Sequence, residues 1–290
     1  MTATEQDLVA LPAGLRDRVL DASWQARAVG RPVHQVAPIS PVEAFSRTAD
    51  ALYGTLCALP EQVWCRPVLR GLDVQCLIGH LIGVEHDLGL SLAGDPDVAR
   101  ADHAESTWPA AIAQAGRRFD QTRTDWRHAV DRTLEMLRIR ADHLTDEVAL
   151  HGMRLPLASL LIVRAFELWT HDDDIRRVAG LPLAEPEPST LRLMTELAAG
   201  LLPHAVARMG QREPVSVHLV LTGPGGGTWD VAVGEDRRPV ACAISIVADA
   251  VGFCRLVANR TGPADLDPLV IGDSRRIAGI LAAASSLALD

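Results

Sequence analysis

Apolar residues recur at helical spacing along the first two thirds of the chain and predict long helices there. The segment Ser40-Pro41-Val42-Glu43 offers a hydroxyl N-cap, a proline at the first helical position and a glutamate three residues after the cap. This capping box predicts that a helix begins here, and Pro60 ends it. Asp73 can cap a second helix, whose apolar stripe continues to about Gly94.

Two further helical regions follow the same pattern. The third covers residues 107–146, opens at Thr107-Trp108-Pro109 and has a break near Asp120. The fourth covers residues 157–178 and closes at a glycine. Four long helices with modest connections predict an antiparallel four-helix bundle over residues 40–184.

The pattern changes after a proline-rich joint at residues 181–188. A helix over 189–209 precedes a run of β-branched residues, a glycine-rich turn and a second such run, which together predict a hairpin. One more strand and two more helices are expected at 241–246, 248–259 and 275–288. The fold class is therefore α+β, with three parts: an N-terminal extension with one helix (1–39), the bundle (40–184) and a smaller α+β domain (185–290).

Composition narrows the classes of function. The 290 residues are 48% hydrophobic, 22% charged and only 4% aromatic, so Leu, Ala and Val do most of the packing in a globular protein. The net charge of −9 opposes phosphate backbones and anionic membrane surfaces, and we expect neither nucleic acid nor a membrane as partner. The first residues lack the basic flank and apolar run of a secretory signal, which favours the cytoplasm.

The cysteines do not indicate a fold held together by disulfides or by a structural zinc ion. They are odd in number and widely spaced, with no CxxC pair, so we expect reduced and mostly buried thiols rather than disulfides or a zinc knuckle. The five are Cys57, Cys65, Cys76, Cys242 and Cys254.

The sharpest candidate for chemistry is Glu167 with His171 on the fourth helix. Residues four apart share one helix face and can hold one ion together, although a plain surface hydrogen bond has the same spacing. The turns before Glu167 are apolar, and a carboxylate there needs a partner. His80, within the apolar second helix, is either that partner or a core histidine satisfied by hydrogen bonds. Two imidazoles and one carboxylate would form a metal site with positions open for substrate.

Two longer motifs carry a family resemblance. They are GLDVQCLIGHLIGVE at residues 71–85 and RAFELWTHDDD at residues 164–174. As a pair they resemble the mycothiol-dependent maleylpyruvate isomerase family, which belongs to the DinB-like metal-binding four-helix bundles. The resemblance covers residues 40–180.

The resemblance implies that His80, Glu167 and His171 bind zinc or another divalent metal, with mycothiol as thiol cosubstrate. Such an ion lowers the pKa of a bound thiol and holds a thiolate for attack on a small electrophilic substrate. The implied activity is therefore that of a metal-dependent thiol transferase or isomerase. The resemblance also implies that an arginine at the end of a C-terminal helix holds an anionic substrate. Arg260 matches this position best and Arg255 is the fallback, whereas a solvated arginine favoured by the helix dipole is the alternative.

Other ionisable residues receive plainer interpretations. Residues 172–174 form either a solvated acidic face or, for Asp174, a contact that orients a metal ligand. Glu85 is placed outside the ligand set. The remaining histidines are interpreted as surface or capping residues: His34, His86, His103, His128, His143, His151, His204 and His218.

Two other functions compete with thiol transfer. The bundle could serve as a non-catalytic, metal-stabilised sensor or interaction module, which an N-terminal extension would suit. It could also activate water as a metal-dependent hydrolase. An open coordination position beside a cleft favours transfer, whereas a buried site with four protein ligands favours the module. The sequence leaves the electrophile, the exact metal and the oligomeric state open.

Overall fold

The computed structural model describes residues 36–211, 213–234 and 242–288. Residues Val36–Asp290 make up one compact unit. The helix predicted at residues 13–28 lies outside the described residues. Within the described part, no helix combines the length and apolarity needed to cross a bilayer.

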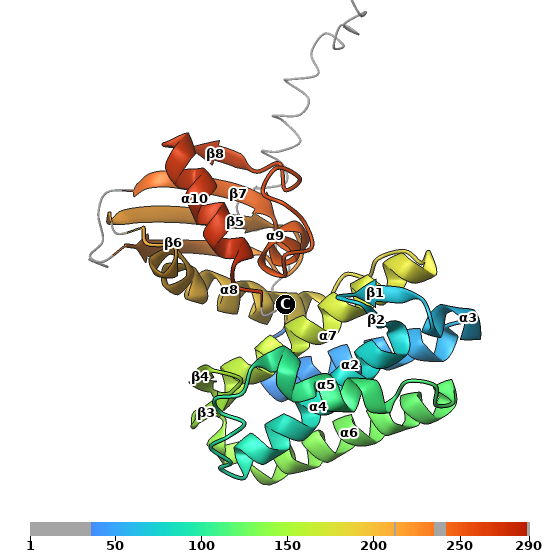
Figure 1. Cartoon of the computed structure of the whole chain (residues 1–290). Helices are drawn as coiled ribbons and strands as arrows, with labels where there is room; N and C mark the ends of the chain where they lie inside the picture. Colours follow the sequence, from blue (N-terminus) through green and yellow to red (C-terminus); the bar gives the residue numbers. More distant parts are fainter. Residues whose placement is uncertain (1–35, 212, 235–241, 289–290) are drawn as a thin grey trace, which may run out of the picture. The chain divides into compact units, whose positions relative to one another are not determined.

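Four long helices dominate the first half of the described chain (Figure 1). They are α2 (Pro41–Ala58), α4 (Val74–Leu92), α6 (Phe119–Ile139) and α7 (Leu157–Ala179). Shorter elements connect them: α3 (Glu61–Trp64), α5 (His103–Ala113), a 3₁₀ turn (Ala141–His143) and the two hairpins β1–β2 (Pro67–Leu69, Leu72–Asp73) and β3–β4 (Glu147–Leu150, Met153–Pro156). The hairpins are additions to the predicted bundle.

The second half contains a four-stranded mixed sheet, which confirms the α+β class. Strand order is β6-β5-β7-β8, with β5 and β7 parallel and the other pairs antiparallel. The predicted hairpin forms between β5 and β6, whereas β8 was not predicted. The elements are α8 (Pro188–Arg208), β5 (Val215–Thr222), β6 (Gly227–Val233), β7 (Cys242–Asp249), α9 (Ala250–Val257), β8 (Leu269–Ile271) and α10 (Ser274–Ser285).

Side-chain caps fix where the first helices begin. The Ser40 hydroxyl accepts the Glu43 N–H at 3.1 Å, and the Asp73 carboxylate accepts the Cys76 N–H at 2.8 Å. Only the hydroxyl half of the predicted capping box is recorded, because the Glu43 carboxylate pairs with Arg47 one turn later. The caps start α2 and α4 where the sequence predicts.

The third helical region is divided into two helices at residues 114–118, close to the predicted break near Asp120. Its start differs from the prediction, because the first helix begins at His103 rather than at Thr107. The Asp102 carboxylate accepts the N–H groups of Ala104 and Glu105, which starts α5 one turn early. Pro109 lies inside α5 instead of opening it. This shift places His103 on a helix packed against α4.

Two hydrophobic clusters meet along α7. One face of α7, with Leu161 and Leu168, belongs to the cluster inside the bundle. Another face, with Phe166 and Trp169, packs with the buried side of the sheet and with α8, α9 and α10. The predicted boundary near residue 185 stays a prediction, and α7 contributes to the cores on both sides of it.

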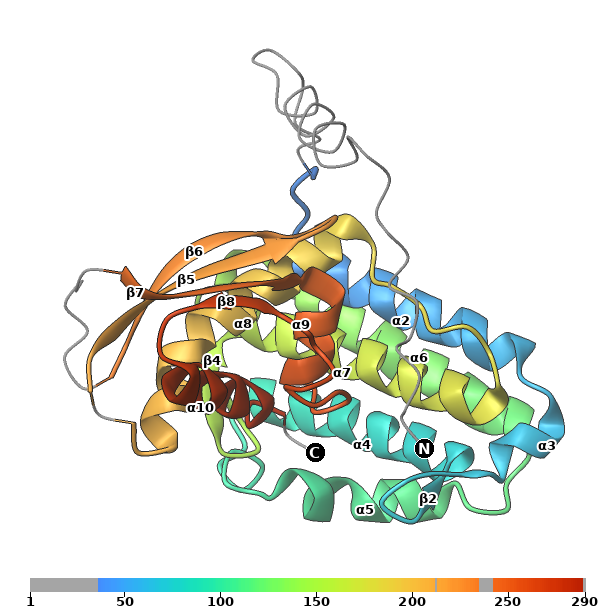
Figure 2. The ribbon, with the colours of Figure 1, turned by 90° about the horizontal axis from the view of Figure 1, so that it is seen from above.

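Glycines allow α5 to approach α4 closely (Figure 2). A Cβ added at Gly79 would lie 2.8 Å from both the Ala110 carbonyl oxygen and the Ala111 Cα. One at Gly83 would lie 3.1 Å from the Thr107 Cβ. Because the first contacts are with backbone, no side-chain rotation relieves them.

This contact predicts opposite effects for two helical glycines. We expect Gly79→Ala to lower the free energy of unfolding by about 1–3 kcal/mol, since overpacking outweighs the gain in helix propensity. Gly54→Ala on α2 is the matched control, because nothing lies within 4 Å of the added Cβ. It should raise stability by about 0.5–1 kcal/mol. Urea unfolding measures both, and equal stabilisation of the two variants would contradict the close approach.

Candidate metal centre

Three predicted residues converge between α4 and α7. The donor atoms of His80, Glu167 and His171 all lie within 4.8 Å of one another. Glu167 Oε1 is 3.2 Å from His80 Nε2 and 4.0 Å from His171 Nε2. The three residues are only 8%, 9% and 1% exposed, respectively. The structure therefore assembles the predicted set, whose role as metal ligands stays a prediction.

A buried arginine holds the other oxygen of Glu167. Arg164, one turn earlier on α7, donates from Nη1 to Glu167 Oε2 and from Nη2 to Glu85 Oε1, the latter at 2.7 Å. The Thr133 hydroxyl donates to the second Glu85 oxygen at 2.7 Å. Burial opposes ionisation of Glu167, yet the charge of Arg164 holds the pKa of this carboxyl well below its ordinary value. Glu167 is thus an oriented carboxylate.

Hydrogen bonds on the far side orient both predicted imidazoles. The Thr107 hydroxyl donates to the His103 carbonyl, so it accepts from His80 Nδ1 at 2.7 Å. His171 Nδ1 lies 3.2 Å from Asp174 Oδ2 and donates to that carboxylate. Each ring then presents an unprotonated Nε2 toward Glu167. Metal-binding histidines are commonly oriented in this way.

The site includes a histidine that the sequence analysis assigned to the surface. His103 Nε2 lies 3.3 Å from Glu167 Oε1. Its Nδ1 is 2.9 Å from His151 Nδ1, and His151 Nε2 is 2.9 Å from Asp87 Oδ2. The surface interpretation of His103 and His151 is therefore wrong. Asp102 three residues before Glu105 was the available signal, because that spacing is typical of a helix start.

The donor set fits a divalent cation. The buried Nε2 of His171 has no hydrogen-bond partner among the described residues. Burial lowers the pKa of His80, which favours the neutral imidazole that a metal requires. Unprotonated ring nitrogens and a carboxylate oxygen repel one another unless a cation lies between them. Imidazole and carboxylate are also the ligands that zinc accepts.

The acidic run after His171 is buried and paired, so it is not a solvated face. Residues 172–174 are all less than 10% exposed. Asp172 pairs with Arg176, and Asp173 accepts from Arg255 at 2.9 Å. Burial raises the pKa of Asp172. The second interpretation, in which Asp174 contacts a ligand, agrees with its position beside His171.

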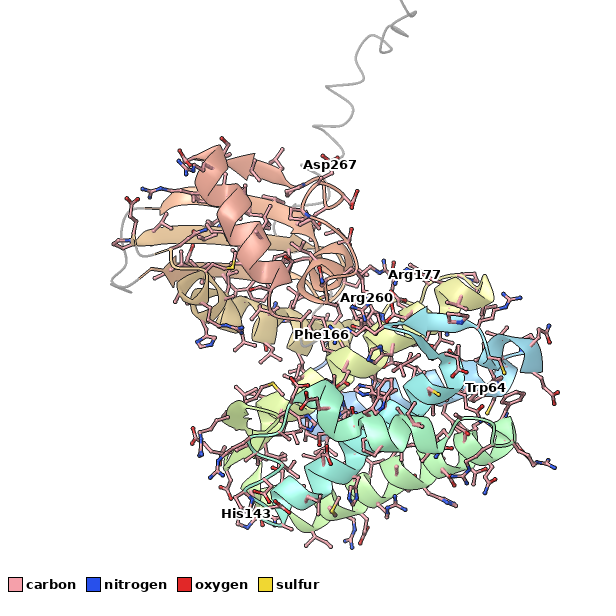
Figure 3. All side chains as sticks on the ribbon, in the orientation of Figure 1. Trp64, His143, Phe166, Arg177, Arg260 and Asp267 are labelled. Atoms are coloured by element: carbon pink, nitrogen blue, oxygen red, sulfur yellow. The ribbon has the colours of Figure 1, made fainter. Side chains whose placement is uncertain are left out.

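Both candidate arginines reach α7 from the end of α9. Arg260 donates from Nε to Asp174 Oδ1 and from Nη2 to Asp174 Oδ2, both at 2.8 Å. Arg177 also donates to Asp174, and Figure 3 shows the two arginines beside each other. Burial opposes the charge of Asp174, but hydrogen bonds with His171 and Arg260 lower the pKa of this carboxyl. The anion-binding role of Arg260 stays a prediction.

Pockets approach the cluster from two sides. One holds about 480 Å³ of empty space, open solvent at its mouth included, and is lined by the three imidazoles, the β1–β2 turn and α5. The other holds about 570 Å³ by the same measure and is lined mainly by apolar residues of α7, α8 and α9, with Glu167 in its wall. Each pocket therefore reaches at least one residue of the cluster.

The described cysteines differ from the expected burial pattern. Cys76 and Cys254 are buried, whereas Cys57 and Cys65 are exposed, and all four are free thiols. Burial raises the pKa of Cys76 to about 11 and that of Cys254 further. The two buried thiols are therefore poor nucleophiles at neutral pH.

Arg164 should matter more to stability than any exposed arginine. We expect Arg164→Met to cost about 3–5 kcal/mol of unfolding free energy, because it leaves Glu85 and Glu167 buried without their cation. Adding Glu85→Gln should restore part of that loss. The control variant is Arg154→Met, because Arg154 is exposed and its guanidinium lies 3.6 Å from the Glu147 carboxylate. This substitution should change the free energy of unfolding by under about 0.5 kcal/mol. Similar losses from the two arginine variants in urea unfolding would refute this network.

Comparison with known proteins places the helical region in a family. Two solved structures are similar, each with a TM-score of 0.55 over 76% of this chain and 88% of the other: the mycothiol-dependent maleylpyruvate isomerase at 18% identity and a histidine-to-alanine mutant of that enzyme at 17%. At this identity the likeness shows the fold. Among curated proteins the comparison finds no match. Residues 45–176 match the model described as the mycothiol maleylpyruvate isomerase N-terminal domain, and this match places that part of the chain in the domain family.

Proposed function

We propose that the protein is a metal-dependent thiol transferase or isomerase that uses mycothiol or a similar low-molecular-weight thiol. The observation that carries this proposal is the convergence of His80, Glu167 and His171 on one buried point. The match of residues 45–176 to the mycothiol maleylpyruvate isomerase N-terminal domain supports mycothiol as cosubstrate. The similar solved structures are of an enzyme that depends on mycothiol.

The chain's own residues would hold a zinc or similar ion and keep it accessible. When bound, the ion would lower the pKa of a thiol and supply a thiolate nucleophile at neutral pH. Arg164 fixes the Glu167 carboxylate, while Thr107 and Asp174 fix the two imidazoles. The buried cysteines are poorly suited to this task, which supports a thiol from outside the chain.

The two pockets beside the cluster are candidate binding sites for the thiol and for the electrophile. The pocket beside the imidazoles would admit the thiol group of the cosubstrate, with Arg70 at its edge. The apolar pocket beside Glu167 suits the carbon skeleton of a small electrophile. Arg260 would hold an anionic group of that electrophile. It contacts Asp174, which also accepts a hydrogen bond from His171.

Removing one imidazole should release the ion without unfolding the bundle. We expect purified wild-type protein to retain one equivalent of zinc and His171→Ala to retain little or none. Helical content should persist, because apolar packing supplies most of the bundle's stability. Metal analysis and circular dichroism measure the two effects.

The control variant is His86→Ala, since His86 is exposed on α4, the helix that carries His80. It should keep its zinc. A panel of thiols with electrophiles then tests activity in the wild type. Wild-type protein without bound or bindable metal would refute the proposal, and metal retention without thiol-dependent turnover would favour the sensor module.

The anion-binding role of Arg260 predicts a kinetic loss without a metal loss. We expect Arg260→Ala to lower kcat/KM on an anionic electrophile while zinc content stays unchanged. Arg255→Ala is the matched control, because it removes an ion pair between the same two helices that involves Asp173 instead. A lower kcat/KM in the Arg255 variant alone would assign the anion-binding role to Arg255. Full activity in both variants would confine the site to the helical region.

A further inference from the structure

His103 faces Glu167 in the same manner as the predicted ligands. Its Nε2 is 3.3 Å from Glu167 Oε1, against 3.2 Å for His80 and 4.0 Å for His171. The His80 ring lies between the other two, with centroid distances of 4.9 Å to His103 and 5.8 Å to His171. One carboxylate oxygen is therefore surrounded by three imidazole nitrogens.

The separations of Glu167 Oε1 from His80 and His103 match the spacing of ligands around one ion. Neighbouring donors in a tetrahedral zinc site lie roughly 3.3 Å apart, because metal–donor bonds are about 2.0–2.1 Å long. The distance from Glu167 Oε1 to His103 Nε2 fits this edge as well as the distance to His80 does. By this criterion His103 is better placed than His171.

Residues behind His103 fix its orientation. Asp87 accepts hydrogen bonds from the Ser106 hydroxyl at 2.5 Å and from His151 Nε2 at 2.9 Å. His151 Nδ1 is then free to accept from His103 Nδ1, which leaves His103 Nε2 unprotonated and facing Glu167. A metal-bound histidine usually donates its second ring N–H to a carboxylate. Here the His151 ring lies between the Asp87 carboxylate and His103.

The turn that carries His151 is itself held in place. His151 has a φ of 49°, a conformation that costs energy for a residue other than glycine. Its N–H donates to the Val98 carbonyl, and the Gly152 N–H donates to the Ala99 carbonyl. These bonds keep the His151 ring against His103 and Asp87.

We propose that His103 is a fourth protein donor to the ion of this site, with His151 and Asp87 as its positioning residues. The inference rests on the proposed function only in assuming that the site binds a divalent ion. Three imidazoles and one carboxylate would complete a tetrahedron. Four protein donors are the arrangement expected of a metal-stabilised module, so thiol transfer at such a site would require that a thiol entering from the adjacent pocket displace one donor or add a fifth.

One measurement tests the proposal on the unmodified chain. The full-length protein, labelled with ¹⁵N in histidine, is loaded with ¹¹³Cd in place of zinc. We expect resolved ¹¹³Cd–¹⁵N couplings to three Nε2 atoms, those of His80, His103 and His171. Couplings to two histidines, with His103 Nε2 still protonated, would show that His103 only donates a hydrogen bond to Glu167 and would overturn the proposal.

Zinc affinity gives an independent test, with chelator competition as the measurement and circular dichroism as the check of folding. We expect His151→Ala to weaken binding by about 10–100-fold, the usual effect of removing a residue that supports a ligand. His103→Ala should weaken binding at least as much. His128→Ala is the control, because His128 is exposed on α6, and it should bind like the wild type.

The outcomes separate this inference from the proposed function. If His80→Ala abolishes binding while His103→Ala matches the His128 control, the metal site stands and the fourth donor is refuted. If the wild type binds no zinc or cadmium, both proposals fail. A folded His103→Ala protein with strongly reduced affinity, together with three couplings in the wild type, supports the fourth donor.

Discussion

The centre of the helical region depends on one buried carboxylate whose two oxygens have different partners. Glu167 Oε2 is held by Arg164, and Oε1 faces imidazole nitrogens. Glu85 and Glu167 supply two negative charges against the one positive charge of Arg164. Because an uncompensated buried charge costs several kcal/mol, neutral imidazoles leave this group in need of another cation. The proposed divalent ion between Oε1 and the rings would supply that charge.

Helix α7 connects this site to the sheet-containing half of the chain. One carboxylate, Asp174, accepts from His171 Nδ1 and from Arg260 at the end of α9. A displacement of α9 would therefore change the orientation of His171, a proposed metal ligand. The neighbouring pair of Asp173 and Arg255 repeats the link one residue away. The C-terminal half is thus placed to influence the site through electrostatic contacts.

Local signals predicted a large part of this fold and of its site. The hydroxyl of Ser40 and the carboxylate of Asp73 start their helices because such caps act within one turn. The i,i+4 spacing placed Glu167 and His171 on one face for the same local reason. His151 is different, because its role depends on a hairpin that brings it to Asp87, 64 residues away. Contacts of that range leave no periodic signal in a single sequence.

In the proposed metal site, helix packing rather than ligand identity would decide how many protein donors there are. His80, Glu167 and His171 lie on long helices whose positions are fixed by the bundle core. His103 lies at the first turn of the short helix α5, which reaches α4 only because Gly79 has no side chain. A single added methyl group there would push α5 outward and carry His103 away from Glu167. A three-donor site open to substrate and a four-donor site can therefore differ by one methyl group in a helix contact, with every ligand residue unchanged.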